Sequence, residues 1–247
     1  MSYINKLNSK LRRSLAIRKF LNEEMSLAEC RDLIKKSLIN REVNFLIFMK
    51  KAIYENKNSP YLELLKLSRI TYDDVEKMVA REGIEGALTI LKDEGVYITF
   101  QEFKNGKEVV RKGRSFKFRA EDFLNPAQDG LGEIYSGGSG GAATRIHFTI
   151  EYLMQKVIHE AVIFDIHKFT DDPLAIWLPA LPAGTALYPM RLQKIGVFPK
   201  AWFSQFHALD RNLFSVRDTL PIIKHNLWKF FVGAQWPDAK YVSLNEA

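Results

Sequence analysis

The sequence predicts a mixed α/β fold, with a helical N-terminal region over residues 1–95 and a partial α/β nucleotide-binding domain over residues 96–247. Helix-start signals and apolar residues at helical spacing fill the first region. Short alternating segments and glycine-containing turns begin after Gly95. With 247 residues and 47% hydrophobic side chains, the chain has ample material for a buried core.

The helical region contains three starts in which a capping residue is followed by an acid or a proline. These are Ser26 with Glu29, Ser59 with Pro60, and Thr71 with Asp74. We expect Gly83 and Gly95 to stop helices, because glycine tolerates the left-handed conformation at a helix end. Residues 43–49 are apolar on nearly every side of a helix, which predicts that they are buried.

After Gly95 the pattern predicts short strands at residues 96–100, 108–111 and 115–119. Asn105-Gly106 is a strong hairpin signal between them. Cations alternate with phenylalanines in this segment: Lys104, Lys107, Arg111, Lys112, Arg114, Lys117 and Arg119 with Phe103, Phe116 and Phe118. Such alternation is typical of the solvent-exposed face of an antiparallel hairpin. A nucleic-acid stacking surface is the disfavoured alternative.

The last elements to be predicted follow residue 144. Residues 145–149 alternate polar and apolar side chains as a half-buried strand does, and Thr149 then caps a helix to about Asp165. Residues 175–179 predict a buried strand, with a loop over 182–185 at its carboxyl end. A helix extending to Gly196 is expected after that loop.

The most distinctive segment is the glycine-rich run over residues 135–145. Its glycines permit close backbone approach to a ligand, and its hydroxyls and Arg145 can donate hydrogen bonds to phosphate oxygens. Flanks that look ordered argue against a flexible linker. The spacing matches neither a Walker A loop nor a dinucleotide fingerprint. Residues 137–141 formally match G-x-S-x-G, but a hydrolase elbow needs a helix next, where a strand is expected.

The run Ser136-Gly-Gly-Ser-Gly-Gly-Ala-Ala-Thr144 resembles the phosphate loop of the adenylate-forming enzymes. The proline usual in that family is Ala143 here, and the usual lysine is Thr144, followed by Arg145. Threonine at this position is similar to the phenylacetate–CoA ligase branch. Residues 55–65, 95–103 and 236–247 also resemble segments of that branch, including members grouped with acyl-protein synthetases. The resemblance extends from about Asn56 to the last residue.

The resemblance implies a sheet-and-helix large domain and an acid–thiol ligase activity that forms AMP. ATP, with Mg²⁺, would activate a carboxylic acid as an acyl-adenylate, and coenzyme A or a protein thiol would then accept the acyl group. The implied phosphate-binding residues are Ser136, Gly137, Gly138, Ser139, Gly140, Gly141, Thr144 and Arg145. Gly184 and Thr185 are the implied lining of the acyl pocket. Neither the acid nor the catalytic residues can be assigned from the resemblance.

Residues 243–246 form a helix-start signal with one residue after it. Together with the resemblance, this predicts that the chain is the N-terminal half of a longer enzyme. The Mg²⁺ ligands would lie in the missing half, and the chain alone would not catalyse ATP–pyrophosphate exchange. A non-catalytic or partner-completed half-enzyme is the alternative.

Composition sets the remaining expectations. The single cysteine, Cys30, excludes an internal disulfide and lies in a helical pattern that predicts a buried, inert thiol. The sequence shows neither a signal peptide nor a membrane span, so we expect a cytoplasmic protein. The net charge of +7 allows anionic partners. No two of the five histidines have metal-ligand spacing on a helix, so no metal site is predicted.

Overall fold

The computed structural model describes residues 3–125, 132–135, 145–169, 172–178, 187–204 and 227–242. These residues form a mixed helical and sheet structure, which confirms the predicted fold class at that level. They divide into two compact units. The first unit comprises Met1–Ile34 and Gly130–Ala247, and the second unit comprises Lys35–Asp129. The boundary expected at residue 95 falls inside the second unit.

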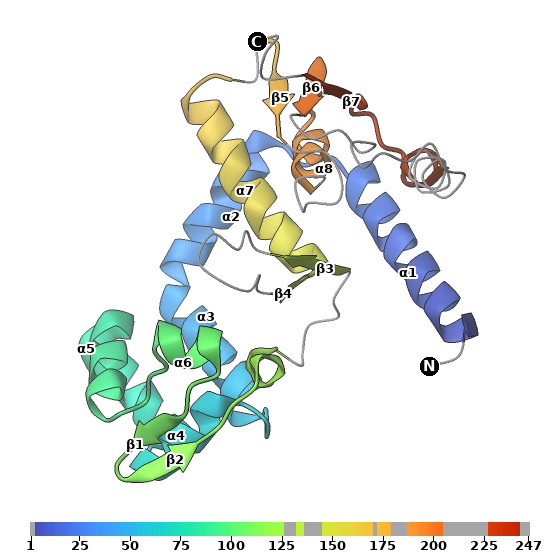
Figure 1. The fold of residues 1–247 in the computed structure, drawn as a ribbon. Helices are drawn as coiled ribbons and strands as arrows, with labels where there is room; N and C mark the ends of the chain where they lie inside the picture. The colour runs from blue at the N-terminus through green and yellow to red at the C-terminus, as the bar shows by residue number, and fades with distance from the viewer. Residues whose placement is uncertain are drawn as a thin grey trace. The chain divides into compact units, whose positions relative to one another are not determined.

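Helices make up most of the second unit (Figure 1). In chain order they are the end of α2 (Leu27–Ile39), α3 (Arg41–Phe48), the π-helix η1 (Met49–Tyr54), α4 (Pro60–Ser68), α5 (Tyr72–Asp93), α6 (Phe100–Asn105) and the 3-10 helix η2 (Ala120–Phe123). The predicted starts at Pro60 and Thr71 are confirmed. Thr71 and Asp74 form the reciprocal hydrogen bonds of a capping box.

The two predicted glycine stops are both sites of positive φ. Gly95, with φ 89°, follows the last residues of α5, as expected. Gly83, with φ 68°, breaks the helix, which then resumes at once within α5. Glycine is required at both positions because a Cβ would be strained at such backbone angles.

Burial of residues 43–49 was predicted and is wrong for most of the segment. Met49 is buried and Phe45 and Leu46 are partly buried against the core of the second unit, but Val43, Ile47 and Phe48 are exposed. The physical reason is that α3 packs on one side only, against η1 and α5. Its other side presents apolar side chains to solvent.

The strand predicted at residues 96–100 is also wrong. Thr99 and Glu102 form a capping box that starts α6, and this local bonding overrides the alternating pattern. Asn105-Gly106 does not make the hairpin turn, because Gly106 instead ends α6 in a left-handed conformation. The hairpin joins β1 (Val109–Arg111) to β2 (Arg114–Phe116) through Lys112 and Gly113.

The core of the second unit is formed mainly by side chains from η1, α4, α5 and β1. Its buried members are Met49, Ala52, Ile53, Leu62, Leu64, Leu65, Val75, Val79, Ala87, Leu91, Val96 and Val109. Phe116 and Phe118 pack on the edge of this cluster. The β1–β2 hairpin is thereby attached to the helices by apolar contacts.

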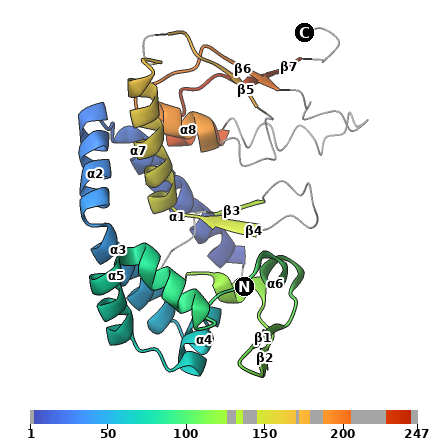
Figure 2. The same cartoon turned by 90° about the vertical axis from the view of Figure 1, so that its left-hand side faces the viewer.

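The first unit contains helices α1 (Tyr3–Asn22), α7 (Ile150–Ile166) and α8 (Leu187–Lys194) and the remaining strands. Strands β3 (Gly132–Tyr135) and β4 (Arg145–Phe148) pair antiparallel. Strands β5 (Ala175–Trp177), β6 (Ala201–Ser204) and β7 (Ala239–Tyr241) form a parallel sheet in the order β5-β6-β7. Figure 2 shows the β3–β4 hairpin beside the start of α7.

Several predicted boundaries in the first unit are confirmed. The Ser26–Glu29 capping box forms at the start of α2. The strand at β4, the α7 helix and the strand at β5 lie where expected. The predicted burial of the latter strand is wrong for Ala175 and Trp177, which are exposed because only the Ile176 side of β5 packs on the core. Gly196, with φ 72°, follows α8. The predicted helix start at residues 243–246 lies outside the described residues.

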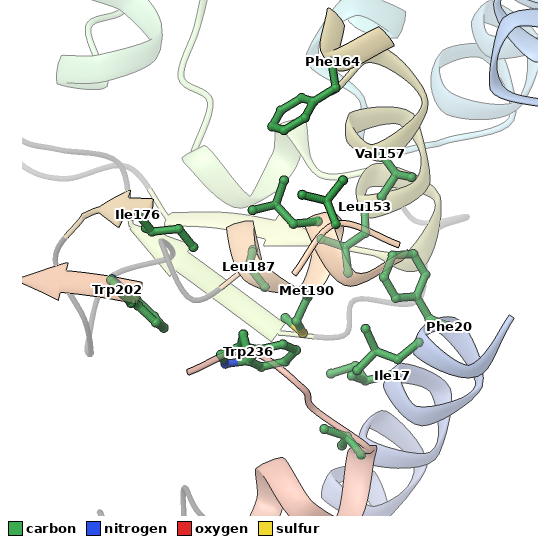
Figure 3. Close-up of a cluster of buried hydrophobic side chains, with 14 residues drawn as sticks. Ile17, Phe20, Leu153, Val157, Phe164, Ile176, Leu187, Met190, Trp202 and Trp236 are labelled. Carbon is green, nitrogen blue, oxygen red and sulfur yellow. The ribbon is translucent and has the colours of Figure 1, made fainter. Parts of the chain in front are cut away.

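The core of the first unit joins α1, α7 and α8 to one face of the parallel sheet (Figure 3). Ile176 of β5 and Trp202 of β6 point into it, and Leu153 and Val157 of α7 are fully buried within it. Within the described part of the chain, no helix has the length and apolar character needed to cross a membrane.

Candidate functional site

The glycine-rich segment joins two strands that are paired with each other. Tyr135 of β3 lies opposite Arg145 of β4, and the ladder continues to Gly132 opposite Phe148. The predicted ligands Ser136, Gly137, Gly138, Ser139, Gly140, Gly141 and Thr144 lie between these strands, outside the described residues. Arg145 is placed at the first position of β4. β3, β4 and α7 therefore follow one another in the predicted order, and the residues between the two strands lie outside the described part of the chain.

Helix α7 begins directly after this hairpin. Thr149 is buried and has an extended backbone, and its Oγ1 accepts a hydrogen bond of 3.1 Å from the N–H of Tyr152. Glu151 in the first turn interacts favourably with the positive end of the helix dipole. The N-cap predicted from sequence is therefore confirmed, and it fixes the point at which β4 turns into the helix.

Replacing Thr149 with alanine is expected to destabilise the first unit by about 1 kcal/mol, because the N–H of Tyr152 would lose its acceptor. Trp177, Trp202, Trp228 and Trp236 are the four tryptophans of the chain, and all lie in the first unit. Urea unfolding followed by tryptophan fluorescence would measure the change. Thr149→Ser keeps the hydroxyl and should retain most of the stability, whereas equal losses in both variants would contradict a capping role.

The same order of elements argues against a hydrolase. A nucleophile elbow carries its serine on a sharp turn from a strand into a helix. Here the residue run that formally matches the elbow motif is followed by β4, and α7 starts only after that strand. The order of the described elements therefore differs from that of a nucleophile elbow.

The carboxyl edge of the parallel sheet is a second candidate region. Its strands end at Trp177, Ser204 and Tyr241, and parallel strands bring these ends to one edge. Ligands of open α/β sheets generally bind at this edge. Two further hydrogen bonds extend it, from the N–H of Leu178 to the Phe203 carbonyl at 3.1 Å and from the N–H of Val242 to the Ser204 carbonyl at 3.0 Å. Gly184 and Thr185, the predicted acyl-pocket residues, follow β5 in sequence and lie outside the described residues.

One row of side chains at this edge was missed by sequence reasoning. Trp177, Phe203 and Lys240 are register partners on three neighbouring strands, so they share one face of the sheet. The rings of Trp177 and Phe203 lie 6.1 Å apart, and both Trp177 and Lys240 are exposed. An exposed indole can stack on a flat ring, and the lysine two strands away on the same face can attract an anion.

The opposite face of the sheet is structural. Ile176 and Trp202 are buried in the core of the first unit. The indole N–H of Trp202 donates a hydrogen bond of 2.8 Å to the Leu178 carbonyl, which satisfies its polar atom. The alternation along β5 and β6 therefore separates a packing face from a face that remains open among the described residues.

Lys194 is the one buried lysine described in the first unit, and its contacts are structural. Its ammonium group donates a hydrogen bond to the Glu23 carbonyl and lies 5.1 Å from the centre of the Phe20 ring. The N–H of Met25 donates in return to the Lys194 carbonyl at 3.3 Å. Burial lowers the pKa of Lys194. The group ties the end of α8 to the segment after α1.

The basic segment of the second unit uses its rings for packing. Phe116 and Phe118 are stacked 5.7 Å apart, and Phe118 and Phe103 each contact Phe123 edge to face. Arg111 is buried in an ion pair with Glu102. The phenylalanines and Arg111 therefore do not form an open surface of alternating cations and rings, and the contacts fit a hairpin packed on its own unit.

Cys30 is fully buried, as predicted, and burial raises the pKa of its thiol, which disfavours the reactive thiolate. Among the residues that the structure describes, no cluster of three or more histidines, cysteines or acids could hold a metal ion.

Comparisons with known proteins provide no family assignment. No protein-family model, no curated protein and no solved structure matches the chain.

Proposed function

We propose that residues 136–145 bind the phosphates of ATP, and that the chain takes part in the activation of a carboxylic acid as an acyl-adenylate followed by thioester formation. The observation that carries this proposal is the hairpin in which Tyr135 and Arg145 are paired across the glycine-rich segment, with the capped helix α7 directly after it. This order agrees with the phosphate loop that the residues resemble.

Each residue type in the segment has a role in this proposal. Ser136, Ser139 and Thr144 donate hydroxyl hydrogen bonds to the β- and γ-phosphates, and Arg145 supplies a charge-assisted donor in place of the usual lysine. Gly138, Gly140 and Gly141 allow the backbone N–H groups to approach the oxygens. Such donors stabilise the charge that develops on the departing pyrophosphate. Mg²⁺ bound with ATP would neutralise further phosphate charge.

Coenzyme A or a protein cysteine would accept the acyl group, since both react with an acyl-adenylate through a thiolate. The triphosphate of ATP is the group that the segment would recognise.

The first test is the triple variant Ser136→Ala, Ser139→Ala and Thr144→Ala in a calorimetric titration with Mg-ATP. Loss of charge-assisted hydrogen bonds is expected to weaken binding by about tenfold or more. Adenosine, which lacks phosphates, should bind the wild-type and variant chains equally weakly. Failure of the wild-type chain to bind ATP, or unchanged ATP affinity in the triple variant, would refute the phosphate-binding proposal.

A matched pair of arginine variants separates a specific site from general attraction to a basic chain. Arg145 and Arg114 each occupy the first position of the second strand of a hairpin, and Arg114 is exposed in the other unit. Arg145→Ala should reduce ATP affinity, whereas Arg114→Ala should leave it unchanged. Equal losses would indicate attraction by net charge alone.

A further inference from the structure

An exposed apolar stripe runs along one side of α3 and the helical segments on either side of it. Ile39, Val43 and Ile47 repeat every four residues, and 81%, 55% and 47% of their respective surfaces are exposed. Leu38 and Phe48 are exposed beside them. We call these five residues the α3 stripe. All belong to the second unit.

Val43 and Ile47 lie on one side of α3, and Ile39 lies just before it at the end of α2. The N–H of Asn40 bonds to the Lys36 carbonyl at 3.0 Å, and the N–H of Asn44 bonds to the Asn40 carbonyl at 2.8 Å, so bonds of helical spacing are kept on both sides of Asn40, whose φ of −95° and ψ of 18° separate the two helices. Residues three or four positions apart on a helix lie on the same side. The core-facing residue Met49 lies on a different side, since it is buried.

Lysines flank the stripe at both ends. Lys36 precedes Ile39 by three residues in α2, Lys51 follows Ile47 by four in η1, and both side chains are exposed. In sequence order, an exposed ammonium group therefore stands on each side of the three aliphatic side chains. Lys35 and Lys50 add positive charge next to the two ends.

The two charged residues within α3 are directed away from the α3 stripe. Arg41 forms an ion pair with Glu85 of α5. A carboxylate oxygen of Glu42 lies 3.8 Å from the position that a Cβ on Gly83 of α5 would occupy. The only acid between Lys35 and Lys51 is thus beside α5, and the stripe itself carries apolar groups and positive charge.

We infer that the α3 stripe docks on the surface of a membrane containing anionic phospholipids, with its aliphatic side chains in the interfacial layer. Basic residues around an apolar helical face are typical of helices that lie in the membrane interface. Lysine stems can lie along the apolar layer while their ammonium groups reach the phosphates. Charge complementarity with the headgroups favours this occupant. A protein partner is disfavoured, because protein interfaces are depleted in lysine and centred on Trp, Tyr or Arg.

Co-sedimentation of the whole chain with vesicles tests the inference. The chain should bind vesicles of phosphatidylcholine with phosphatidylserine, and salt or pure phosphatidylcholine should reduce that binding. Lys36→Glu with Lys51→Glu should weaken binding by about thirtyfold. Ile39→Asn with Ile47→Asn should weaken it by about tenfold or more, because buried apolar area is lost.

Matched variants in the same unit provide the controls. Lys57→Glu with Lys107→Glu reverses two exposed charges away from the stripe, and Leu88→Asn replaces an apolar residue exposed on α5. Both should bind the vesicles about as the wild-type chain does. No binding to anionic vesicles, or equal losses in control and stripe variants, would overturn the inference.

Sedimentation equilibrium without lipid tests whether the stripe is instead a contact between copies of the chain. If the chain self-associates and the stripe variants abolish this association, the stripe is a protein contact and the membrane inference is wrong. A monomer that binds vesicles through the stripe supports it. Each result is independent of ATP binding, so the inference and the proposed function can fail separately.

Discussion

Replacing Glu102 with glutamine is expected to destabilise the second unit by roughly 3 kcal/mol. The carboxylate makes two parallel hydrogen bonds of 2.9 Å with Arg111, and the two side chains are only 11% and 9% exposed. The variant keeps the shape of Glu102 but removes its charge. It leaves the guanidinium group buried without a counter-charge, which is more costly than the loss of a neutral hydrogen bond.

Further contacts hold the side chains of Glu102 and Arg111 in position. Glu102 Oε2 also accepts a hydrogen bond of 2.7 Å from the N–H of Thr99, which is the capping bond of α6. Arg111 donates to the Tyr97 carbonyl at 2.9 Å and lies 3.8 Å from the centre of the Tyr97 ring. One ion pair therefore joins the start of α6 to β1 and, through Tyr97, to the segment before α6.

The pH dependence of stability provides a second measure of the pair. The hydrogen bonds from Arg111, with those from Thr99, lower the pKa of Glu102 from 4.5 to about 2. A lowered folded-state pKa stabilises the fold above pH 4.5 and loses that contribution as the pH falls toward 2. The shift corresponds to roughly 3 kcal/mol. Urea unfolding followed by circular dichroism should therefore show a difference between wild type and Glu102→Gln that shrinks over this interval.

An exposed ion pair in the same unit supplies the control. Glu63 and Lys66 pair at 2.8 Å on α4, three residues apart, with about half of each side chain exposed. Glu63→Gln should cost less than about 1 kcal/mol. The double variant Glu102→Leu and Arg111→Met should be more stable than Glu102→Leu alone, since it leaves no unpaired buried charge. Equal effects of Glu63→Gln and Glu102→Gln would contradict the buried pair as the cause.

The region around this ion pair also shows what local patterns can and cannot predict. Residues 96–100 alternate as a strand does, yet the bonds between Thr99 and Glu102 start a helix there. Lys112 and Gly113, both with positive φ, make the turn that Asn105-Gly106 was expected to make. Each error arose where two local signals competed. The Glu102–Arg111 ion pair, in turn, joins residues nine positions apart that no periodicity relates.

Around the candidate site, the predictable features are those whose cause lies within a few residues. The cap at Thr149, the strand at residues 145–148 and the end of α8 before Gly196 all follow from short-range bonding or backbone angles. The row formed by Trp177, Phe203 and Lys240 could not be predicted, because it depends on the register of strands widely separated in sequence. The exposed α3 stripe was missed for a related reason, since apolarity alone does not say which side of a helix is covered.

Leu153→Ala is expected to destabilise the first unit by about 2–5 kcal/mol. Leu153 lies in the first turns of α7, has no exposed surface, and packs in the cluster that joins α1, α7, α8 and the parallel sheet. Its truncation removes apolar contacts and leaves a cavity that the surrounding helices can close only in part. Because Trp202 and Trp236 are buried in the same cluster, urea unfolding followed by tryptophan fluorescence reports this core directly.

The control is Ile163→Ala on the same helix, because 51% of the surface of Ile163 is exposed. Its cost should be below about 1 kcal/mol, because little buried surface is lost and helix propensity favours alanine. The proposed ATP site ends at Arg145, and β4 joins it to the Thr149 cap of the helix that Leu153 anchors. ATP should therefore raise the unfolding midpoint of Leu153→Ala, since a ligand that binds the folded state stabilises it by mass action. A variant with full core stability would show that α7 is not anchored through Leu153, and a stable variant without ATP affinity would place Leu153 in the binding site itself.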